Sequence, residues 1–244
     1  MAELKGLNPA PKILALDIET KPAVVYAWKL FDVNVAVNQI VEVSRIICVA
    51  ATWVGEDKAY FFADWLPGGR TAMLKGIYNM MAEADAVITY NGDKFDLTKL
   101  RGEFLLEGFS PLPPLTSIDL YKTVKKLGFQ SGKLEFIGPF LGLGDKVKHE
   151  GFSLWTKVME GDEAAQERMQ NYCIGDVILT VKLYLLIRPY ITNHPHMGEE
   201  ARACGACGSN KVQSRGYRRT KAFKIQRLQC TSCGSWQDGK RSKV

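Results

Sequence analysis

Residues 13–19 read ILALDIE, an apolar run in which the only polar residues are Asp17 and Glu19. Such a run predicts a buried strand, and successive side chains of a strand point to opposite faces. Asp17 and Glu19 therefore share one face, and Ile18 points to the other. Two neighbouring carboxylates repel each other, so both stay ionised only with a cation between them. The pair suits Mg²⁺ or Mn²⁺, which prefer oxygen ligands, although acids at an exposed strand end would give the same pattern.

Further strand and helix patterns follow in an order that predicts an α/β fold. We expect strands at 45–54, 58–63 and 86–90, and a weak strand at 117–121. Apolar residues at helical spacing predict helices at 70–83, 94–107, 133–141, 152–159 and 162–187. This order predicts a mixed β-sheet flanked by helices. The polar stretch at 191–201 predicts a linker, so we expect one domain over 1–190 and a small one over 202–244.

The charge of the chain is unevenly distributed. Of 244 residues, 46% are hydrophobic and 24% are charged, as in ordinary globular proteins. Residues 199–244 contain 11 Lys and Arg against 3 Asp and Glu, and residues 1–198 contain the remaining 21 against 23. The long first part therefore has the near-neutral balance of an enzyme body. The short second part has the positive charge of a surface that meets polyanions.

Membrane insertion and secretion are not predicted. No apolar run reaches the roughly 18 residues that a membrane helix needs. The first twelve residues, MAELKGLNPAPK, lack the apolar core of a signal peptide. We therefore expect a cytoplasmic protein without a membrane partner. A chain of this length has no room for a polymerase beside the first domain, so any polymerase would be a separate partner.

Two further acids occur in informative contexts. Asp96 comes directly after YNGDKF (90–95), where a predicted strand gives way to a helix. An acid on the first helical turn also stabilises the helix dipole, which alone would explain it. Asp176 lies within the helix predicted at 162–187, four residues after Tyr172, so both project from one face. A buried Asp in an apolar stretch is costly without a partner, and a metal ion would remove that cost. A solvated helix edge would need no metal.

In sequence order, these residues resemble the three exonuclease motifs of the DEDD superfamily. The motifs are D-x-E on the first strand, N-x-x-x-F-D after a later strand and Y-x-x-x-D on a final helix. The resemblance is to the tyrosine branch, as in the exonuclease domain of family B DNA polymerases. The histidine branch carries a His five residues before the last Asp, where this chain has Asn171. The resemblance covers roughly residues 12–190 and implies a ribonuclease H-like fold and a 3′–5′ exonuclease.

The resemblance also implies a mechanism. Two divalent ions, Mg²⁺ or Mn²⁺, would activate a water molecule and stabilise the leaving 3′ oxygen. Tyr172 would orient that water, because a pKa near 10 makes it a poor base at neutral pH. The product would be a nucleoside 5′-monophosphate. The implied metal ligands are Asp17, Glu19, Asp96 and Asp176.

Substrate-binding residues are implied in the same way. Asn91 would contact the strand and Phe95 would pack beside the terminal base, although Phe95 also begins the apolar stripe of a helix and could belong to the core. Lys133 occupies a place where related enzymes touch the strand. Three further aromatic residues could stack on unpaired bases, and core filling is the expected role of at least one of them. They are Tyr26, Trp28 and Phe31.

The six cysteines form two groups. Cys48 and Cys173 stand alone in apolar surroundings and are expected to be buried free thiols. The other four form two C-x-x-C pairs with 22 residues between them, which predicts a zinc site. They are Cys204, Cys207, Cys230 and Cys233. Four cysteines complete a tetrahedral site, so His194 and His196 are expected to be linker residues. A module of about 40 residues buries too little core to fold alone, so we expect a zinc ribbon that one structural Zn²⁺ holds together.

The segment between the two cysteine pairs predicts nucleic-acid binding. Arg218, Arg219 and Lys224 interleave with Tyr217 and Phe223, and basic residues neutralise phosphates while aromatic rings stack on bases. A solvated basic face or a surface for a protein partner would show the same composition. Residues 149–177 and 187–195 also resemble small phage-encoded exonucleases in which a polymerase-B-like nuclease domain precedes a zinc ribbon. For a phage protein, the expected location is the host cytoplasm.

Rival functions remain open at this point. A catalytically silent nucleic-acid-binding protein would keep the fold and use the ribbon, but it would have no reason to keep all four acids and the tyrosine. An exoribonuclease acting on RNA is a further alternative. The polymerase resemblance favours the 3′ ends of single-stranded or frayed DNA as substrate, and a separate DNA polymerase or replication protein could be a second partner. Roles in proofreading, recombination and degradation are not distinguished.

Overall fold

The computed structural model describes residues 11–244. The first ten residues of the predicted nuclease domain, including most of the stretch tested for a signal peptide, lie outside the described residues. Five strands form the main sheet in the order β5-β4-β1-β6-β7. They are β1 (Ile13–Thr20), β4 (Ile46–Trp53), β5 (Ala59–Ala63), β6 (Ala86–Thr89) and β7 (Thr116–Asp119). The first three pair antiparallel, whereas β6 and β7 join in parallel, which confirms the predicted mixed sheet.

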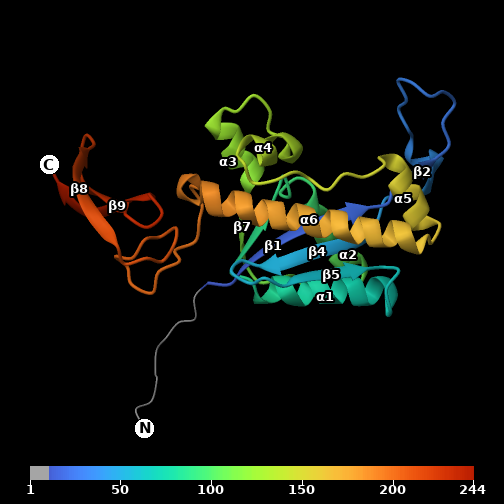
Figure 1. Ribbon diagram of the computed structural model, residues 1–244, viewed down its shortest axis with the longest axis horizontal. Coiled ribbons are helices and arrows are strands. Elements are labelled where there is room, and N and C mark those ends of the chain that lie inside the picture. Colours follow the sequence, from blue (N-terminus) through green and yellow to red (C-terminus); the bar gives the residue numbers. More distant parts are fainter. Residues whose placement is uncertain (1–10) are drawn as a thin grey trace, which may run out of the picture.

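Helices cover both faces of this sheet (Figure 1). One face packs against α1 (Gly69–Glu83) and α2 (Asp96–Leu106), and the other against the long α6 (Glu163–Ile187). Three shorter helices, α3 (Leu120–Leu127), α4 (Leu134–Phe140) and α5 (Phe152–Met159), contribute to the core on the α6 side. The arrangement confirms the expected fold class of a mixed sheet flanked by helices.

The alternation along β1 decides which face carries the acids. Leu14, Leu16 and Ile18 belong to the core beneath α1 and α2, and Ile13 and Ala15 belong to the core beneath α6. Asp17 and Glu19 continue the second series because side chains alternate along a strand. Both carboxylates therefore face α6, as the period of two predicts.

The structure differs from expectation on helix α3. The sequence predicts only a weak strand at 117–121, but β7 ends at Asp119 and α3 begins directly after it. The Asp119 side chain caps the helix by accepting a hydrogen bond from the Tyr121 amide, and Gly128 ends it in the left-handed conformation. A cap and a terminal glycine are local signals of a helix, and here they override the short strand pattern.

A two-stranded arm projects between β1 and β4, formed by β2 (Val24–Val25) and β3 (Ile40–Glu42), with the short 3-10 helix η1 (Val37–Gln39) (Figure 1). Tyr26, Trp28 and Phe31 all lie on this arm and all are exposed, Trp28 to 98%. The expectation that at least one of the three fills the core is therefore wrong. The arm extends away from the sheet, so these side chains have no core to enter.

The C-terminal part is a separate three-stranded antiparallel sheet in the order β10-β9-β8. Its strands are β8 (Val212–Arg219), β9 (Phe223–Cys230) and β10 (Trp236–Lys243). The sequence predicts only the β8–β9 pair, because the polar composition of β10 hides its pattern. A 3-10 turn, η2 (Arg188–Tyr190), and an irregular stretch connect this sheet to α6. Within residues 11–244, no helix is long and apolar enough to cross a membrane.

Candidate metal and nucleic-acid site

The predicted acids come from three elements that meet at one end of β1. Asp17 and Glu19 are the last acids of β1, Asp96 is the first residue of α2, and Asp176 lies in the middle of α6. Asp96 Oδ1 accepts a hydrogen bond from the Ile18 amide at 3.1 Å, between the two β1 acids. The Cys173 thiol of α6 approaches the Asp17 carbonyl oxygen at 3.6 Å. These contacts bring together residues that are up to 156 positions apart.

A tight turn places Asp96 at this point. Asn91 adopts a left-handed φ of 68°, and a Cβ on Gly92 would lie only 2.3 Å from Thr89 Oγ1. The turn thus needs glycine at position 92, because any side chain there would collide with β6. The Phe95 and Leu97 amides both donate to the Gly92 carbonyl oxygen, which starts α2 next to the end of β1.

Burial raises the pKa values of all four carboxylates, and neighbouring acids of the site add to the shift at Asp17 and Glu19. Burial, followed by the charges of Asp96, Glu19 and Asp176, raises the pKa of Asp17 well above its usual range. Burial and the charge of Asp176 raise the pKa of Glu19 to about 8, and burial raises that of Asp96 to about 7. Burial also raises the pKa of Asp176. The site holds more negative charge than its buried surroundings can stabilise, which is the condition under which acids bind a cation.

Lys146 belongs to this site, although the sequence analysis missed it. Its Nζ donates to the Tyr172 hydroxyl at 3.0 Å and lies 2.7 Å from Asp176 Oδ2. Burial lowers the pKa of Lys146, but these two partners outweigh it and raise the pKa. The stretch around Lys146 shows no helical or strand period, so no sequence pattern distinguishes it. Its link to the site arises from a loop that folds back onto α6.

Aromatic rings enclose Tyr172 on the same side. The His149 ring lies 4.6 Å from the Tyr172 ring and the Trp155 ring 6.1 Å from it, measured between centroids. Burial and the charge of Asp176 raise the pKa of Tyr172, so its phenol stays protonated at neutral pH. A protonated phenol donates a hydrogen bond and cannot act as a base.

The donor set fits divalent ions that prefer oxygen. Asp176 is 4% exposed, and its Oδ1 is buried without a hydrogen-bond partner. Among the described residues, however, only the cysteine group brings three or more ligand atoms within 4.8 Å of one another. The acids stand further apart, and the Lys146 ammonium group lies beside Asp176. Mg²⁺ and Mn²⁺ prefer carboxylate oxygens as ligands, and one such oxygen here has no hydrogen-bond partner within residues 11–244.

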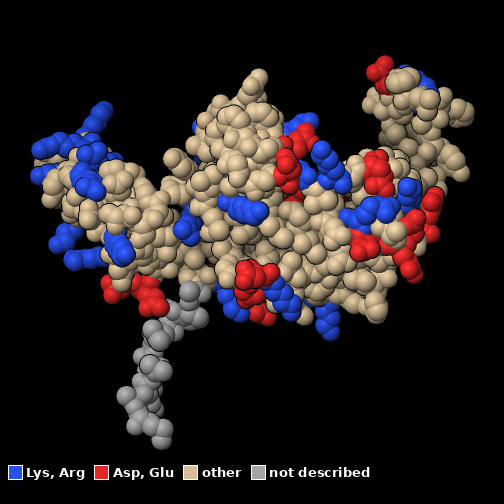
Figure 2. Space-filling model, in the orientation of Figure 1, with Lys and Arg blue, Asp and Glu red and all other residues tan. Residues whose placement is uncertain are grey.

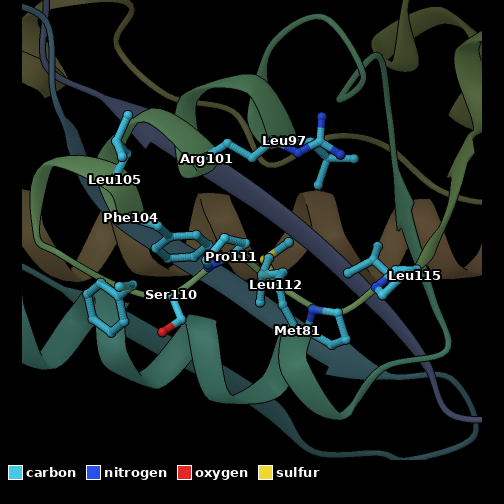
Figure 3. Close-up of a pocket in the computed structure, with 12 residues that line it drawn as sticks. Met81, Leu97, Arg101, Phe104, Leu105, Ser110, Pro111, Leu112 and Leu115 are labelled. Carbon is cyan, nitrogen blue, oxygen red and sulfur yellow. The ribbon is translucent and has the colours of Figure 1, made fainter.

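Of the other predicted substrate residues, Phe95 and Lys133 lie at the surface and Asn91 is half-buried. Phe95 is 41% exposed at the start of α2, so it is not a core residue. Asn91 occupies the turn before it. Lys133 is exposed and pairs with Glu135 at 3.3 Å. A separate apolar pocket of about 480 Å³ lies beside α2, lined by Met81, Leu97 and Phe104 among others (Figure 3). None of the predicted catalytic residues lines it.

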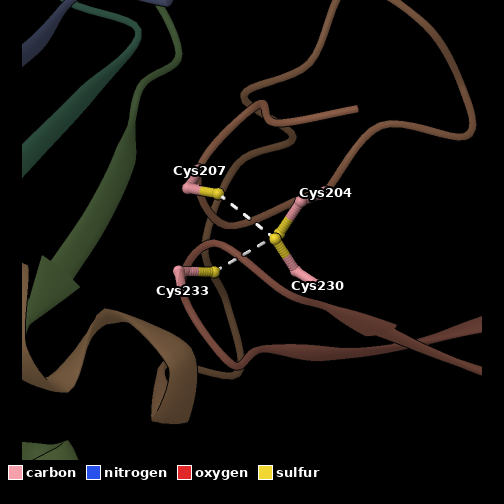
Figure 4. Close-up of side chains that lie close together, drawn as sticks. All are labelled: Cys204, Cys207, Cys230 and Cys233. Carbon is pink, nitrogen blue, oxygen red and sulfur yellow. Dashed lines mark hydrogen bonds between the residues drawn. The ribbon is translucent and has the colours of Figure 1, made fainter. Parts of the chain in front are cut away.

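The four predicted zinc ligands form a compact cluster (Figure 4). Cys204 and Cys233 have their sulfur atoms 3.6 Å apart, and Cys207 and Cys230 have theirs 3.7 Å apart. All four ligand atoms lie within 4.8 Å of one another, a geometry compatible with one tetrahedral Zn²⁺. His194 instead hydrogen-bonds Tyr184 and His196 contacts the Gly198 backbone, so neither belongs to the cluster. Cys48 and Cys173 are fully buried, as expected.

Basic side chains gather over the C-terminal sheet (Figure 2). Lys224 lies 4.2 Å from the centre of the Tyr217 ring, so cation and aromatic ring form one surface. Arg219 is exposed. Arg218 is exposed too, but it makes a two-point ion pair with Asp238, with its Nη2 at 2.6 Å from Oδ2. Of the three predicted contacts, Arg218 is therefore the one already neutralised by a neighbouring acid.

Comparison with known proteins identifies the first part of the chain. A family model described as RNase_H superfamily matches residues 42–188, which is more than half of the chain and contains Asp96, Tyr172 and Asp176. The structure of the family B DNA polymerase from the hyperthermophilic archaeon Pyrobaculum calidifontis superposes with a TM-score of 0.55 at 15% identity. The alignment covers 76% of this chain and 25% of that polymerase, and the likeness concerns the fold. No curated protein matches the chain.

Proposed function

This chain belongs to the RNase H superfamily, and from that premise we propose that it is a metal-dependent 3′–5′ exonuclease of the DEDD type. The observation that carries the proposal is the meeting of four acids from β1, α2 and α6 with Tyr172 and Lys146. The order D-x-E, N-x-x-x-F-D and Y-x-x-x-D supports the tyrosine branch. The expected product is a nucleoside 5′-monophosphate.

The acids would act as the metal ligands. Divalent ions bound by Asp17, Glu19, Asp96 and Asp176 would supply an activated water and stabilise the leaving 3′ oxygen. The buried Oδ1 of Asp176, which has no partner among the described residues, supports this assignment. So do the raised pKa values of the cluster, because a bound cation would let all four acids ionise.

Tyr172 and Lys146 would position the reacting groups. The Tyr172 oxygen accepts a hydrogen bond from Lys146, which leaves the phenol proton to donate to another acceptor, such as the attacking water. Lys146 brings a positive charge within 2.7 Å of Asp176, at the place where the negative phosphodiester would enter. A fixed cation there would favour the extra charge of the transition state.

Unpaired DNA is the substrate class that we infer. Phe95 lies exposed beside Asp96, and the arm that begins directly after the β1 acids exposes Tyr26, Trp28 and Phe31. Exposed rings stack on bases only where the bases are unpaired, which favours single-stranded or frayed 3′ ends. A separate DNA polymerase or replication protein remains a partner that the proposal allows.

The C-terminal ribbon would add affinity for nucleic acid. Its basic side chains alternate with aromatic rings, and one structural Zn²⁺ at the four cysteines would hold the module together. The expected effect is binding that is strong at low salt and weakens as salt rises, because phosphate contacts release counterions.

A catalytically silent nucleic-acid-binding protein is the second candidate. One observation favours it, the ion pair that Lys146 makes with Asp176. If that pair persists in the presence of Mg²⁺ or Mn²⁺, it would compete with a metal ion for the acid. Such a protein would bind DNA through the ribbon and release no nucleotide.

A gel assay on single-stranded DNA labelled at its 5′ end decides between the two. Wild type and Asp17→Ala would be compared with Mg²⁺ or Mn²⁺, with an RNA oligonucleotide in parallel. A ladder that shortens from the 3′ end, needs the metal and vanishes in the variant supports the exonuclease. Cleavage of RNA alone would make it an exoribonuclease. Intact substrates with binding retained would leave the silent protein.

A further inference from the structure

A fifth acid, Asp119, lies next to the site without being one of its predicted ligands. It ends β7, pairs with Thr89 of β6 in the parallel ladder, and is 6% exposed. Within residues 11–244 it forms no ion pair. Its charge acts on Asp96 and is one of the influences that raise the pKa of Asp96. A carboxylate in this place works against the ionisation of a metal ligand, so its other contacts must explain what it does.

Those contacts tie two turns together through one oxygen atom. Asp119 Oδ1 accepts a hydrogen bond from the Asn91 amide at 2.8 Å and from the Tyr121 amide at 3.1 Å. The second bond caps α3, which is a common role for Asp. The first bond reaches 28 residues back along the chain to the turn that follows β6.

The Asn91 turn needs such an anchor. Asn91 adopts a left-handed φ of 68°, a conformation that Asn tolerates better than most residues other than glycine and that neighbouring contacts help to hold. The next residue, Gly92, provides the carbonyl oxygen to which the Phe95 and Leu97 amides donate. Asp96 lies between those two residues and reaches the Ile18 amide at 3.1 Å. Three sets of hydrogen bonds, joined by residues that are neighbours in the chain, therefore link Asp119 through the turn to Asp96 and β1.

We propose that Asp119 is a positioning residue, which holds the Asn91–Gly92 turn so that Asp96 and Phe95 face the site. This inference rests on the proposed exonuclease function. Asp119 itself would be a ligand of neither the metal ions nor the scissile phosphate. Its role depends on an oxygen acceptor at Oδ1 and not on its negative charge, so an amide oxygen in the same place should do the same work.

The test compares Asp119→Ala with Asp119→Asn and with a matched control, Asp162→Ala. Asp162 also caps a helix, accepting from the Ala165 amide at 2.8 Å, but at the far end of α6 and without a bond to the Asn91 turn. Full-length proteins would be assayed for kcat and KM on single-stranded DNA, for thermal unfolding, and for direct Mn²⁺ binding by electron paramagnetic resonance.

We expect Asp119→Ala to lower kcat and Mn²⁺ affinity by about 10- to 100-fold, the usual cost of losing a group that orients a metal ligand. KM should change little. Asp119→Asn should recover most of both losses. Asp162→Ala should lower the unfolding temperature about as much as Asp119→Ala does, because each variant loses a helix cap. It should leave kcat and Mn²⁺ affinity unchanged.

Three results would overturn the proposal. They are an unchanged Mn²⁺ affinity in Asp119→Ala, equal losses in Asp119→Ala and Asp162→Ala, and a failure of Asp119→Asn to recover. If wild type cleaves nothing, the proposed exonuclease fails, and the Mn²⁺ titration still decides whether Asp119 positions Asp96.

Discussion

The chain carries two ligand sets that assemble in opposite ways. The cysteine cluster comes from two short turns of one small sheet, and its ligand atoms lie within 4.8 Å of one another. The carboxylate site draws on β1, α2 and α6, elements spread from Asp17 to Asp176, and its acids stand further apart. The cysteines are local in sequence and have few other buried residues around them. The acids lie on elements whose large apolar core forms from other residues.

This contrast indicates what each metal would do. A small sheet whose core is mainly its own cysteines would depend on a bound metal ion, such as the proposed Zn²⁺, to fold. The acids, by contrast, lie on a strand and two helices that large apolar clusters stabilise on both faces of the sheet, so metal there would serve chemistry and not folding.

The largest effect is expected at the acids. Asp17→Ala should reduce exonuclease activity by about 1000-fold or more, since metal ions contribute several kcal/mol to the transition state and each 1.36 kcal/mol is about tenfold. The variant should unfold at the same temperature as wild type or a higher one, because a half-buried carboxylate that neighbouring acids repel is removed. Activity is measured by 5′-label gel assay. Asp57→Ala, an exposed acid in the β4–β5 hairpin, is the control and should keep full activity.

Breaking the zinc cluster should have the next largest effect, and on a different property. Cys230→Ser should lose the bound zinc and the β8–β10 sheet, and weaken DNA binding by about tenfold at low salt, with a smaller effect at high salt. The rate at saturating DNA should stay within a few-fold of wild type. Metal analysis, a salt titration of DNA binding and kcat measure the three quantities. A large loss of kcat, or an unchanged salt dependence of DNA binding, would contradict the assignment of zinc to folding and of the acids to catalysis. Cys48→Ser is the matched thiol control.

A smaller effect is expected of pH on the stability of the folded protein when no divalent ion is bound to the acids. Their folded pKa values lie above the unfolded ones, so they bind protons more tightly in the folded state. The stability that this provides is fully present below about pH 4 and is lost as pH rises towards 7 and 8, the values for Asp96 and Glu19.

Without added divalent ions, the unfolding temperature should therefore fall as pH rises from 4 to 8. Added Mn²⁺ should flatten this dependence, and Asp96→Asn should reduce it. Because a strong chelator would also remove zinc from the ribbon, the assay uses metal-depleted buffer instead. A flat pH profile in the absence of Mn²⁺ would show that the acids are not coupled in this way.

The smallest effect concerns a pair on the ribbon surface. Arg218 is held by Asp238, so Asp238→Asn should free it and strengthen DNA binding by about threefold at low salt. Arg219→Ala should change binding by a similar factor in the opposite direction. Fluorescence anisotropy with a labelled oligonucleotide measures both. If Asp238→Asn weakens binding, the ion pair orders the ribbon and does not compete with phosphate.

The parts that the sequence predicted share a local cause. The strand ILALDIE, the long helix at 162–187 and the two C-x-x-C pairs each show their pattern within a few turns or strands. The parts it missed depend on distant partners or on weak local signals. Helix α3 is marked only by its Asp119 cap and the glycine that ends it, and strand β10 follows no apolar alternation. The core role expected for an aromatic residue of the arm failed because the arm leaves all three rings exposed.

By itself, the sequence determined the alternation that sets Asp17 and Glu19 on one face, the helical spacing of Tyr172 and Asp176, and the four cysteines. These depend only on the periods of strands and helices and on spacing along the chain. Only the tertiary structure decided that Lys146 reaches Asp176, that Asp119 holds the Asn91 turn and that Arg218 is paired with Asp238. Those contacts join residues 20 to 30 positions apart through loops and strand ends, and no local period records which loop folds back onto which element.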